Sequence, residues 1–180
     1  ANRSIGKDQT PFVIAEMSGN HNQSLGRAME IVEAAAKAGA HVIKLQTYTA
    51  DTITLDISEG EFFISDEKSL WEGNSLYDLY NQAHTPWEWH KPIMQRATEL
   101  GMICFSSPFD ESAVDFLEEL NVPAYKIASF ENNHLPLIKK VASTGKPIII
   151  STGMSTVAEI DESVRVAREY GCTDLILLKC

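Results

Sequence analysis

Residues 102–129 read MICFSSPFDESAVDFLEELNVPAYKIAS, and this stretch contains the pattern that decides the fold. An apolar run at 102–107 is followed by a segment at 112–120 whose apolar residues recur with helical spacing. A second apolar run follows at 124–128. This order predicts a strand, a helix and a second strand joined by short loops. Strands that are joined through a helix pair in parallel, so the stretch predicts one βαβ unit.

The same unit recurs along the whole chain. The six expected strands are 12–16, 41–46, 102–107, 124–128, 147–151 and 174–179. Glycine stands at the end of four expected helices, just before a strand: Gly39, Gly101, Gly145 and Gly171. Glycine is the residue that most readily adopts the left-handed conformation that ends a helix. The chain therefore predicts an α/β fold with a largely parallel sheet.

A doubly wound sheet and a (β/α)8 TIM barrel both fit this alternation, and two features favour the TIM barrel. First, chemically reactive residues stand at the ends of nearly all the expected strands, as they do around the mouth of a barrel. A doubly wound sheet instead concentrates its site at one switch point. Second, no Gly-x-Gly-x-x-Gly motif follows the first expected strand.

The length of the chain indicates how many βα units of a barrel it can contain. A TIM barrel usually takes about 250 residues, and we count about six βα units in 180. We therefore expect residues 1–180 to be the N-terminal part of a TIM-barrel domain, with its last units beyond the chain end. The interval 47–86 is an insertion, for which we expect a short hairpin and a helical piece at 75–84 over the C-terminal mouth. It is either a covering flap or a substrate lid.

Composition excludes several kinds of partner. The chain has 15 Lys and Arg against 25 Asp and Glu, a net charge of −10, and no basic run. This balance argues against nucleic acid and anionic membranes as partners, and no apolar run is long enough to span a membrane. The three scattered cysteines fit neither a disulfide framework nor a CxxC metal site, and they predict a reduced, cytoplasmic protein.

Three lysines, Lys44, Lys126 and Lys179, lie in or at the end of apolar strands, where a lysine without a partner is costly. They either bind an anionic substrate or pair with carboxylates such as Glu16 and Glu131. Serines at neighbouring strand ends, with the backbone N–H groups of the loop 151–154, would complete a phosphate cradle. These serines are Ser107, Ser129 and Ser151.

Other strand-end residues leave several chemistries open. Glu16 suits a general base, or a scaffold ion pair with a lysine. His21, in the loop after the first strand, suits a metal ligand, a base or a loop hydrogen bond. Lys179 or Lys126 could form a Schiff base with a keto substrate, as in some aldolases. A non-catalytic sugar- or phosphate-binding module is the alternative from outside the enzymes.

Five segments resemble, in order, the motifs of the sialic acid synthase family: 14–22, 43–47, 105–110, 125–129 and 150–154. Segments 16–22 and 85–90 look most like its pseudaminic acid branch. The resemblance implies condensation of phosphoenolpyruvate with an N-acetylated amino-sugar aldehyde, with release of phosphate. In this branch the sugar is 2,4-diacetamido-2,4,6-trideoxy-altrose and the product is pseudaminic acid, used for surface glycans. Sister branches make N-acetylneuraminate or legionaminate.

The resemblance also implies roles for single residues. Those matching phosphoenolpyruvate-binding positions are Lys44, Ser107, Lys126, Ser129 and Ser151, and those matching the reacting centre are Glu16 and Gln46. We add Asn20 and His21 as candidates for the sugar side. The family holds a divalent metal, usually manganese, with two histidines that match nothing here, so its ligands are expected beyond residue 180. An antifreeze-like domain that closes the site across a homodimer is also expected there, so the chain alone should be inactive.

Overall fold

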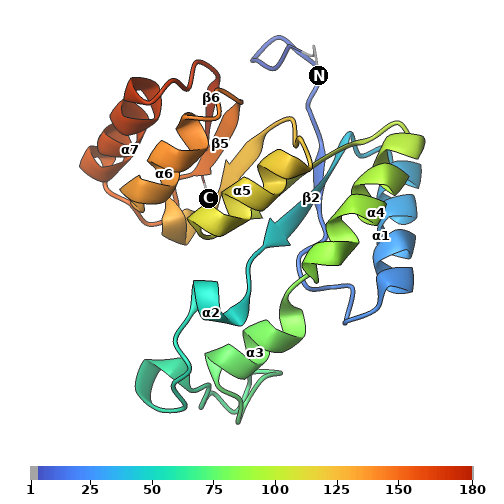
Figure 1. Ribbon diagram of the computed structural model, residues 1–180, viewed down its shortest axis with the longest axis vertical. Coiled ribbons are helices and arrows are strands. Elements are labelled where there is room, and N and C mark those ends of the chain that lie inside the picture. The colour runs from blue at the N-terminus through green and yellow to red at the C-terminus, as the bar shows by residue number, and fades with distance from the viewer. Residues whose placement is uncertain (1–3, 180) are drawn as a thin grey trace.

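The computed structural model describes residues 4–179, and its strands form one curved parallel sheet in chain order, β1 to β6 (Figure 1). A doubly wound sheet would reverse its strand order partway, so the sequential order excludes that alternative. The fold is part of a TIM barrel, as predicted. The strands are β1 (Ile14–Glu16), β2 (Val42–Thr47), β3 (Ile103–Pro108), β4 (Tyr125–Ile127), β5 (Ile148–Ser151) and β6 (Leu175–Leu178).

Each connection between consecutive strands carries a helix that packs on the outer face of the sheet (Figure 1). The helix α7 begins with a capping box, in which Thr156 and Glu159 have the spacing typical of this motif. The predicted glycine stops have positive φ, for example 84° at Gly39 and 71° at Gly145. These helices are α1 (Leu25–Lys37), α4 (Trp87–Glu99), α5 (Glu111–Glu119), α6 (Leu135–Ala142) and α7 (Val157–Glu169).

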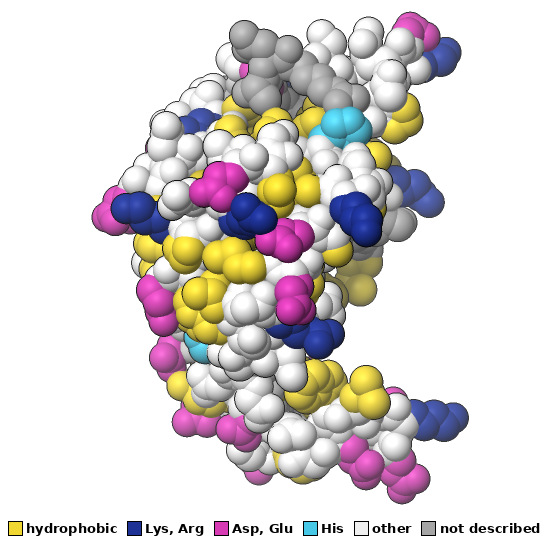
Figure 2. Space-filling view, turned by 90° about the vertical axis from the view of Figure 1, so that its right-hand side faces the viewer, with side chains coloured by type: hydrophobic (Ala, Val, Ile, Leu, Met, Phe, Trp, Pro, Cys, Tyr) yellow, Lys and Arg dark blue, Asp and Glu magenta, His cyan; other side chains and the backbone are white. Residues whose placement is uncertain are grey.

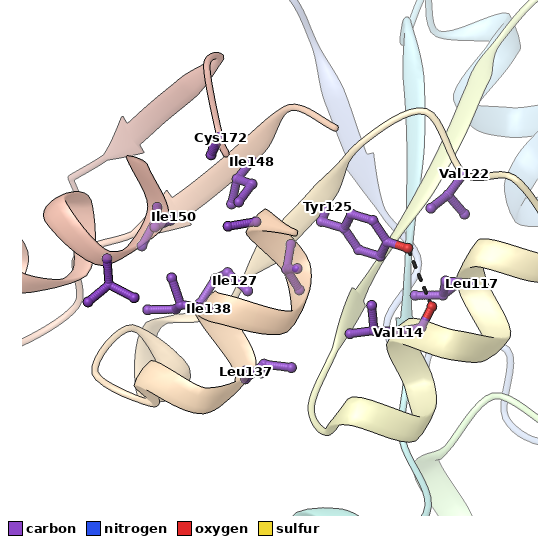
Figure 3. Packing of buried hydrophobic residues seen from close by; sticks show 14 residues of the cluster. Val114, Leu117, Val122, Tyr125, Ile127, Leu137, Ile138, Ile148, Ile150 and Cys172 are labelled. Carbon is purple, nitrogen blue, oxygen red and sulfur yellow. Dashed lines mark hydrogen bonds between the residues drawn. The ribbon is translucent and has the colours of Figure 1, made fainter. Parts of the chain in front are cut away.

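The outward-facing residues of the strands form the main core with these helices. Figure 3 shows the cluster between β4, β5 and helices α5 and α6, which includes Leu117, Ile127 and Leu137. Tyr125 is fully buried among them, and its hydroxyl lies 2.6 Å from Glu118 Oε1 and 3.4 Å from the Val114 carbonyl oxygen. Burying a large aliphatic side chain contributes about 1.5–3 kcal/mol. This cluster therefore fixes the helices on the sheet.

The inward-facing residues change character along each strand. Near the N-terminal ends they are apolar and pack together, with Val42, Phe105 and Ile149 at the centre of the cluster. This cluster borders an apolar cavity of about 480 Å³, also lined by Pro147 and Leu175. Near the C-terminal ends the inward residues are polar. The concave face is thus closed at one end by apolar packing and carries its chemistry at the other.

The insertion projects from the C-terminal ends of the strands and contains α2 (Ala50–Ile53), the 3-10 turn η1 (Gly60–Phe62) and α3 (Leu76–Ala83). It forms the lower lobe of the molecule, and the surface is hollowed between this lobe and the body above it (Figure 2). The predicted helical piece is confirmed. The predicted hairpin is reduced to one antiparallel bridge, between Phe63 and Ser75.

The insertion rests on the loops that follow three strands. The Tyr48 ring, after β2, packs edge-on against Tyr80 of α3 at 5.7 Å and against Phe109, after β3, at 5.3 Å. Gly19, after β1, lies so close to α3 that a Cβ atom there would be 2.9 Å from the Ala83 carbonyl oxygen. These contacts place α3 beside the C-terminal mouth, as predicted.

Some boundaries differ from the expectation. β1 begins at Ile14 rather than at residue 12 because the Val13 carbonyl accepts hydrogen bonds from both His41 N and Val42 N, which interrupts the regular ladder. Cys104 and Cys172 are buried free thiols, whereas Cys180 lies outside the described residues. No helix within residues 4–179 is long and apolar enough to cross a membrane.

Replacing Leu117 by Ala tests the core between β4 and the outer helices. Leu117 is fully buried, so the substitution should lower the free energy of unfolding by about 2–5 kcal/mol in denaturant titrations. The matched control is Leu70→Ala, at a leucine that is 97% exposed, which should change it by less than about 0.5 kcal/mol. Equal effects of the two substitutions would contradict this packing.

Candidate active site

The pairing register brings the polar strand ends together along one rim of the sheet. Glu16 of β1 pairs with Lys44 of β2, and Gln46 of β2 pairs with Ser107 of β3. Ser106 pairs with Tyr125, which sets Ser107 beside Lys126 of β4. The predicted strand-end residues therefore converge at the C-terminal mouth.

Lys44 and Glu16 form an ion pair with 3.6 Å between Nζ and Oε1. The Lys44 side chain is 6% exposed, whereas the Glu16 side chain is 59% exposed. Burial lowers the pKa of Lys44, and the Glu16 carboxylate opposes this shift. Glu16 is thus both the scaffold partner of a lysine and a carboxylate that solvent and substrate can reach.

Lys126 donates hydrogen bonds to two neutral oxygens and lies within electrostatic reach of the Glu131 carboxyl group. Its ammonium donates to Ser151 Oγ at 2.6 Å and to the Ile127 carbonyl oxygen at 3.0 Å, and the residue is 7% exposed. Hydroxyl and carbonyl dipoles stabilise the ammonium without cancelling its charge. Lys126 therefore brings a hydrogen-bonded amine to the rim, next to the turn η2 (Ser129–Glu131) that follows β4.

Two buried polar atoms near Lys126, Ser107 Oγ and Glu131 Oε2, have no hydrogen-bond partner among the described residues. Leaving such an atom unpaired costs about 1–3 kcal/mol, and native proteins rarely do so. Burial raises the pKa of Glu131, while the charge of Lys126 opposes the shift. These unpaired atoms mark the part of the rim where a polar ligand would gain hydrogen bonds.

Asn132 joins the turn after β4 to the loop after β5. The residue is 3% exposed, and its amide donates to the carbonyl oxygens of Ser151 at 3.2 Å and Thr152 at 2.7 Å. Its Oδ1 atom accepts from Ser155 Oγ at 2.5 Å. The amide therefore holds the backbone that immediately follows the Ser151 side chain.

The loop after β5 also touches the turn after β4 directly. Gly153 has a φ of 51°, and a Cβ atom there would lie 2.9 Å from the Ser129 Cβ atom. Only glycine permits this approach without displacing Ser129. The predicted cradle serines, Ser129 and Ser151, are thus held at a fixed separation although they belong to different βα units.

The two sugar-side candidates, His21 and Asn20, both form hydrogen bonds within the loop after β1. His21 is fully buried, its Nδ1 accepts from the Gln23 backbone N–H at 3.2 Å, and its Nε2 lies 3.0 Å from Thr85 Oγ1. Burial also lowers the pKa of His21. With both ring nitrogens engaged, His21 anchors the loop after β1. Asn20 is exposed, and its amide donates to the Met17 carbonyl oxygen.

Lys179, the Schiff-base candidate, is exposed just after β6. A Schiff-base lysine needs an amine whose charge is disfavoured by burial or by another cation. Lys126 is buried, but its amine is engaged by Ser151, which suits a binding role better than nucleophilic attack.

Sequence reasoning missed two residues, Asn132 in the turn after β4 and His90 on α4, and it named Glu131 only as a possible partner of a lysine. A polar residue after a strand resembles any turn residue, so nothing local distinguished Asn132. A signal did exist for His90, because it shares a buried helix face with Ile93 and Ala97 at helical spacing. A polar residue on such a face needs a buried partner.

Residues 31–180 of the chain match the model of the NeuB family. The chain belongs to the NeuB family. Pseudaminic acid synthase of Helicobacter pylori is 45% identical over 172 residues, which is 96% of this chain and 50% of that protein. N,N'-diacetyllegionaminic acid synthase of Legionella pneumophila is 34% identical over 180 residues, which covers 97% of this chain and 50% of that protein.

A solved structure agrees with this NeuB assignment. The N-acetylneuraminic acid synthetase of Leptospira borgpetersenii serovar Hardjo-bovis, in complex with citrate, superposes with a TM-score of 0.83 at 27% identity. The match covers 99% of this chain and 57% of that one. The chain spans about half the length of the curated relatives it matches. The resemblance to sialic acid synthases and the partial TIM barrel are thereby confirmed.

Stability of this NeuB-family chain should depend on His90 below neutral pH. Burial lowers the pKa of His90 from 6.5 to about 4. Because the unfolded chain binds the proton more readily, the stability from neutral His90 is present above pH 6.5 and is lost as pH falls through about 4, by about 3 kcal/mol in all. Unfolding titrations of wild type and His90→Gln should converge by that amount between about pH 7 and about pH 4. A constant gap would contradict a buried neutral ring.

Proposed function

We propose that this chain carries the phosphoenolpyruvate-binding part of a sialic-acid-type synthase. The observation that carries the proposal is the buried Lys126 ammonium, beside which the Ser107 hydroxyl has no hydrogen-bond partner among the described residues. An anion with several acceptor oxygens would pair with the ammonium and accept a hydrogen bond from the Ser107 hydroxyl. Phosphoenolpyruvate has a phosphate and a carboxylate, so it meets both requirements.

The five candidate residues would bind the substrate by two kinds of interaction. Lys44 and Lys126 supply charge, and hydrogen bonds between charged and polar groups are about twice as strong as neutral ones. The serines supply directional donors from β3, from the turn after β4 and from the end of β5. These serines are Ser107, Ser129 and Ser151.

The condensation needs one water and releases inorganic phosphate. C3 of phosphoenolpyruvate bonds to the aldehyde carbon, and the aldehyde oxygen takes up a proton and becomes a hydroxyl. Water adds to C2, after which the bond between C2 and the phosphate oxygen breaks and leaves a 2-keto acid. Glu16 is exposed at the rim and would accept the proton of the water. Gln46, paired with Ser107, would orient the reacting groups, and the lysines would stabilise the departing phosphate.

The proposed acceptor is 2,4-diacetamido-2,4,6-trideoxy-altrose, and the proposed product is pseudaminic acid. Support comes from the 45% identity with a relative named pseudaminic acid synthase, against 34% with one named for diacetyllegionaminic acid. Legionaminate or N-acetylneuraminate synthesis is the alternative within the family. We also propose that the insertion acts as a lid on the sugar, since α3 lies on the loops after β1 and β2.

We further propose that the working protein contains the remaining barrel strands, an antifreeze-like domain and a second copy of itself. The edge strands β1 and β6 pair on one side only, and the apolar cavity opens on the concave face, which supports further strands there. The cofactor would be a divalent metal, manganese, which polarises the aldehyde. The His, Cys, Asp and Glu side chains of residues 4–179 form no group of three that could hold it, so no step above is routed through it.

The function is tested by phosphate release from phosphoenolpyruvate, using the gene product extended beyond residue 180 and supplied with manganese. The diacetamido-trideoxy-altrose, its legionaminic counterpart and N-acetylmannosamine are assayed side by side. Release with the first sugar alone is expected. Release with another sugar alone would correct the branch, and no release with any would refute the proposal. Lys126→Met should lower kcat/KM about a hundredfold or more, whereas Lys37→Met, at an exposed lysine of α1, should not change it.

Gly153→Ala tests the contact between the two cradle loops. The new Cβ would press on Ser129, so the KM for phosphoenolpyruvate should rise about tenfold or more. Gly145→Ala is the matched control, because its φ of 71° is equally unfavourable for alanine but a Cβ there meets nothing within 4 Å. Both variants should lose stability, and only Gly153→Ala should change KM. A normal KM in Gly153→Ala would contradict the cradle.

A further inference from the structure

A second set of polar residues lies on the outer face of the sheet, directly behind the rim. His90 of α4, Thr47 of β2 and Ser106 of β3 are 0%, 0% and 1% exposed. His90 Nε2 lies 2.8 Å from Thr47 Oγ1, which lies 2.6 Å from Ser106 Oγ. The surroundings are apolar, with the Phe116 ring packed edge-on against His90 at 5.3 Å. Burying three polar side chains in an apolar helix–sheet interface costs free energy, so their presence there requires a structural or functional explanation.

The protons of this cluster can be assigned from its partners. His90 Nδ1 lies 3.3 Å from the Pro86 carbonyl oxygen, which can only accept, so Nδ1 carries the ring proton. Burial keeps the ring neutral, and Nε2 is therefore an acceptor for the Thr47 hydroxyl. Thr47 in turn accepts from the Ser106 hydroxyl. The hydrogen bonds thus run in one direction, from β3 through β2 to the start of α4.

Each strand member of this cluster is adjacent to a residue of the candidate site. Thr47 follows Gln46, and Ser106 precedes Ser107. Successive side chains of a strand point to opposite faces, so Gln46 and Ser107 face the barrel interior while their neighbours face His90. Gln46 and Ser107 also pair with each other in the register of β2 and β3. A shift of either strand end would move both site residues.

We propose that His90 is a positioning residue, which holds the ends of β2 and β3 so that Gln46 and Ser107 keep their places at the rim. The proposal rests on the proposed function, because it takes those two residues as part of the reacting site. Apolar packing alone tolerates small sliding, whereas buried hydrogen bonds specify distance and direction. Removing the His90 ring would leave the Thr47 hydroxyl without its acceptor and free the two strand ends to shift.

Kinetics of the extended protein test the proposal with manganese, phosphoenolpyruvate and its acceptor. His90→Leu and the isosteric Thr47→Val should each lower kcat/KM for phosphoenolpyruvate about tenfold or more. The kcat/KM of the double variant should be no lower than that of the less active single variant, because both substitutions break the same hydrogen-bond network. His90→Gln should recover most of the loss, since its amide oxygen can accept from Thr47. Wild-type kinetics in both single variants, or losses that multiply in the double variant, would overturn the proposal.

His41→Leu is the matched control for a merely structural effect. His41 immediately precedes β2, and its Nδ1 accepts from the Val13 backbone N–H at 3.0 Å, so the same substitution again removes a hydrogen bond. It does so at the opposite end of the strand from the rim. A similar loss of thermal stability with unchanged kcat/KM is expected. A tenfold fall in kcat/KM in His41→Leu would show that any loss of strand stability suffices, and would overturn the specific role of His90.

Amide hydrogen exchange without substrate separates failure of this proposal from failure of the proposed function. His90→Leu and Thr47→Val should lose protection at residues 46–47 and 106–107, and His41→Leu should keep it there. If wild type turns over and exchange in His90→Leu is unchanged, the positioning role alone is wrong. If the wild-type protein releases no phosphate, the proposed function is wrong. A loss of protection in His90→Leu would then show only that His90 orders the strand ends, and would say nothing about catalysis.

Discussion

Every functional feature of this chain depends on the pleat of parallel strands that all run in one direction. Outward side chains such as Leu45 and Ile127 pack under the helices, and inward side chains such as Phe105 fill the concave face. Because the strands run in parallel, their C-terminal ends meet at one rim. Strands of three to six residues therefore carry the core on one face and the candidate site at one end.

Two buried lysines, Lys44 and Lys126, lie at the rim of a chain whose net charge is −10. Lys44 is paired with the Glu16 carboxylate, whereas Lys126 donates to the Ser151 hydroxyl and to a backbone carbonyl oxygen and lies within electrostatic reach of Glu131. An anionic substrate that approaches an acidic protein is therefore attracted only at short distance, inside the mouth. Local geometry rather than net charge decides what this surface binds.

The loops above the rim are held by one another as much as by the sheet. Asn132 joins the turn after β4 to the loop after β5, while Gln23 after β1 donates to the Gln82 and His84 carbonyl oxygens beside α3. The rim and its cover are thus one continuous network of short-range contacts. Such a network can place several weak groups around one substrate, which no single loop could do.

Features that depend on residues within about ten positions of one another were predictable from the sequence. Helical periodicity, the glycine stops and the capping box at Thr156 are of this kind, because neighbouring residues alone produce them. The strand-end candidates followed from the same alternation. Only the tertiary structure decided which of them are buried, such as His21, and which meet across neighbouring strands, such as Gln46 and Ser107. It also created the His90 cluster, whose hydrogen bonds join residues 43 and 59 positions apart. Contacts at that separation depend on how helices dock on the sheet, and no local pattern encodes them.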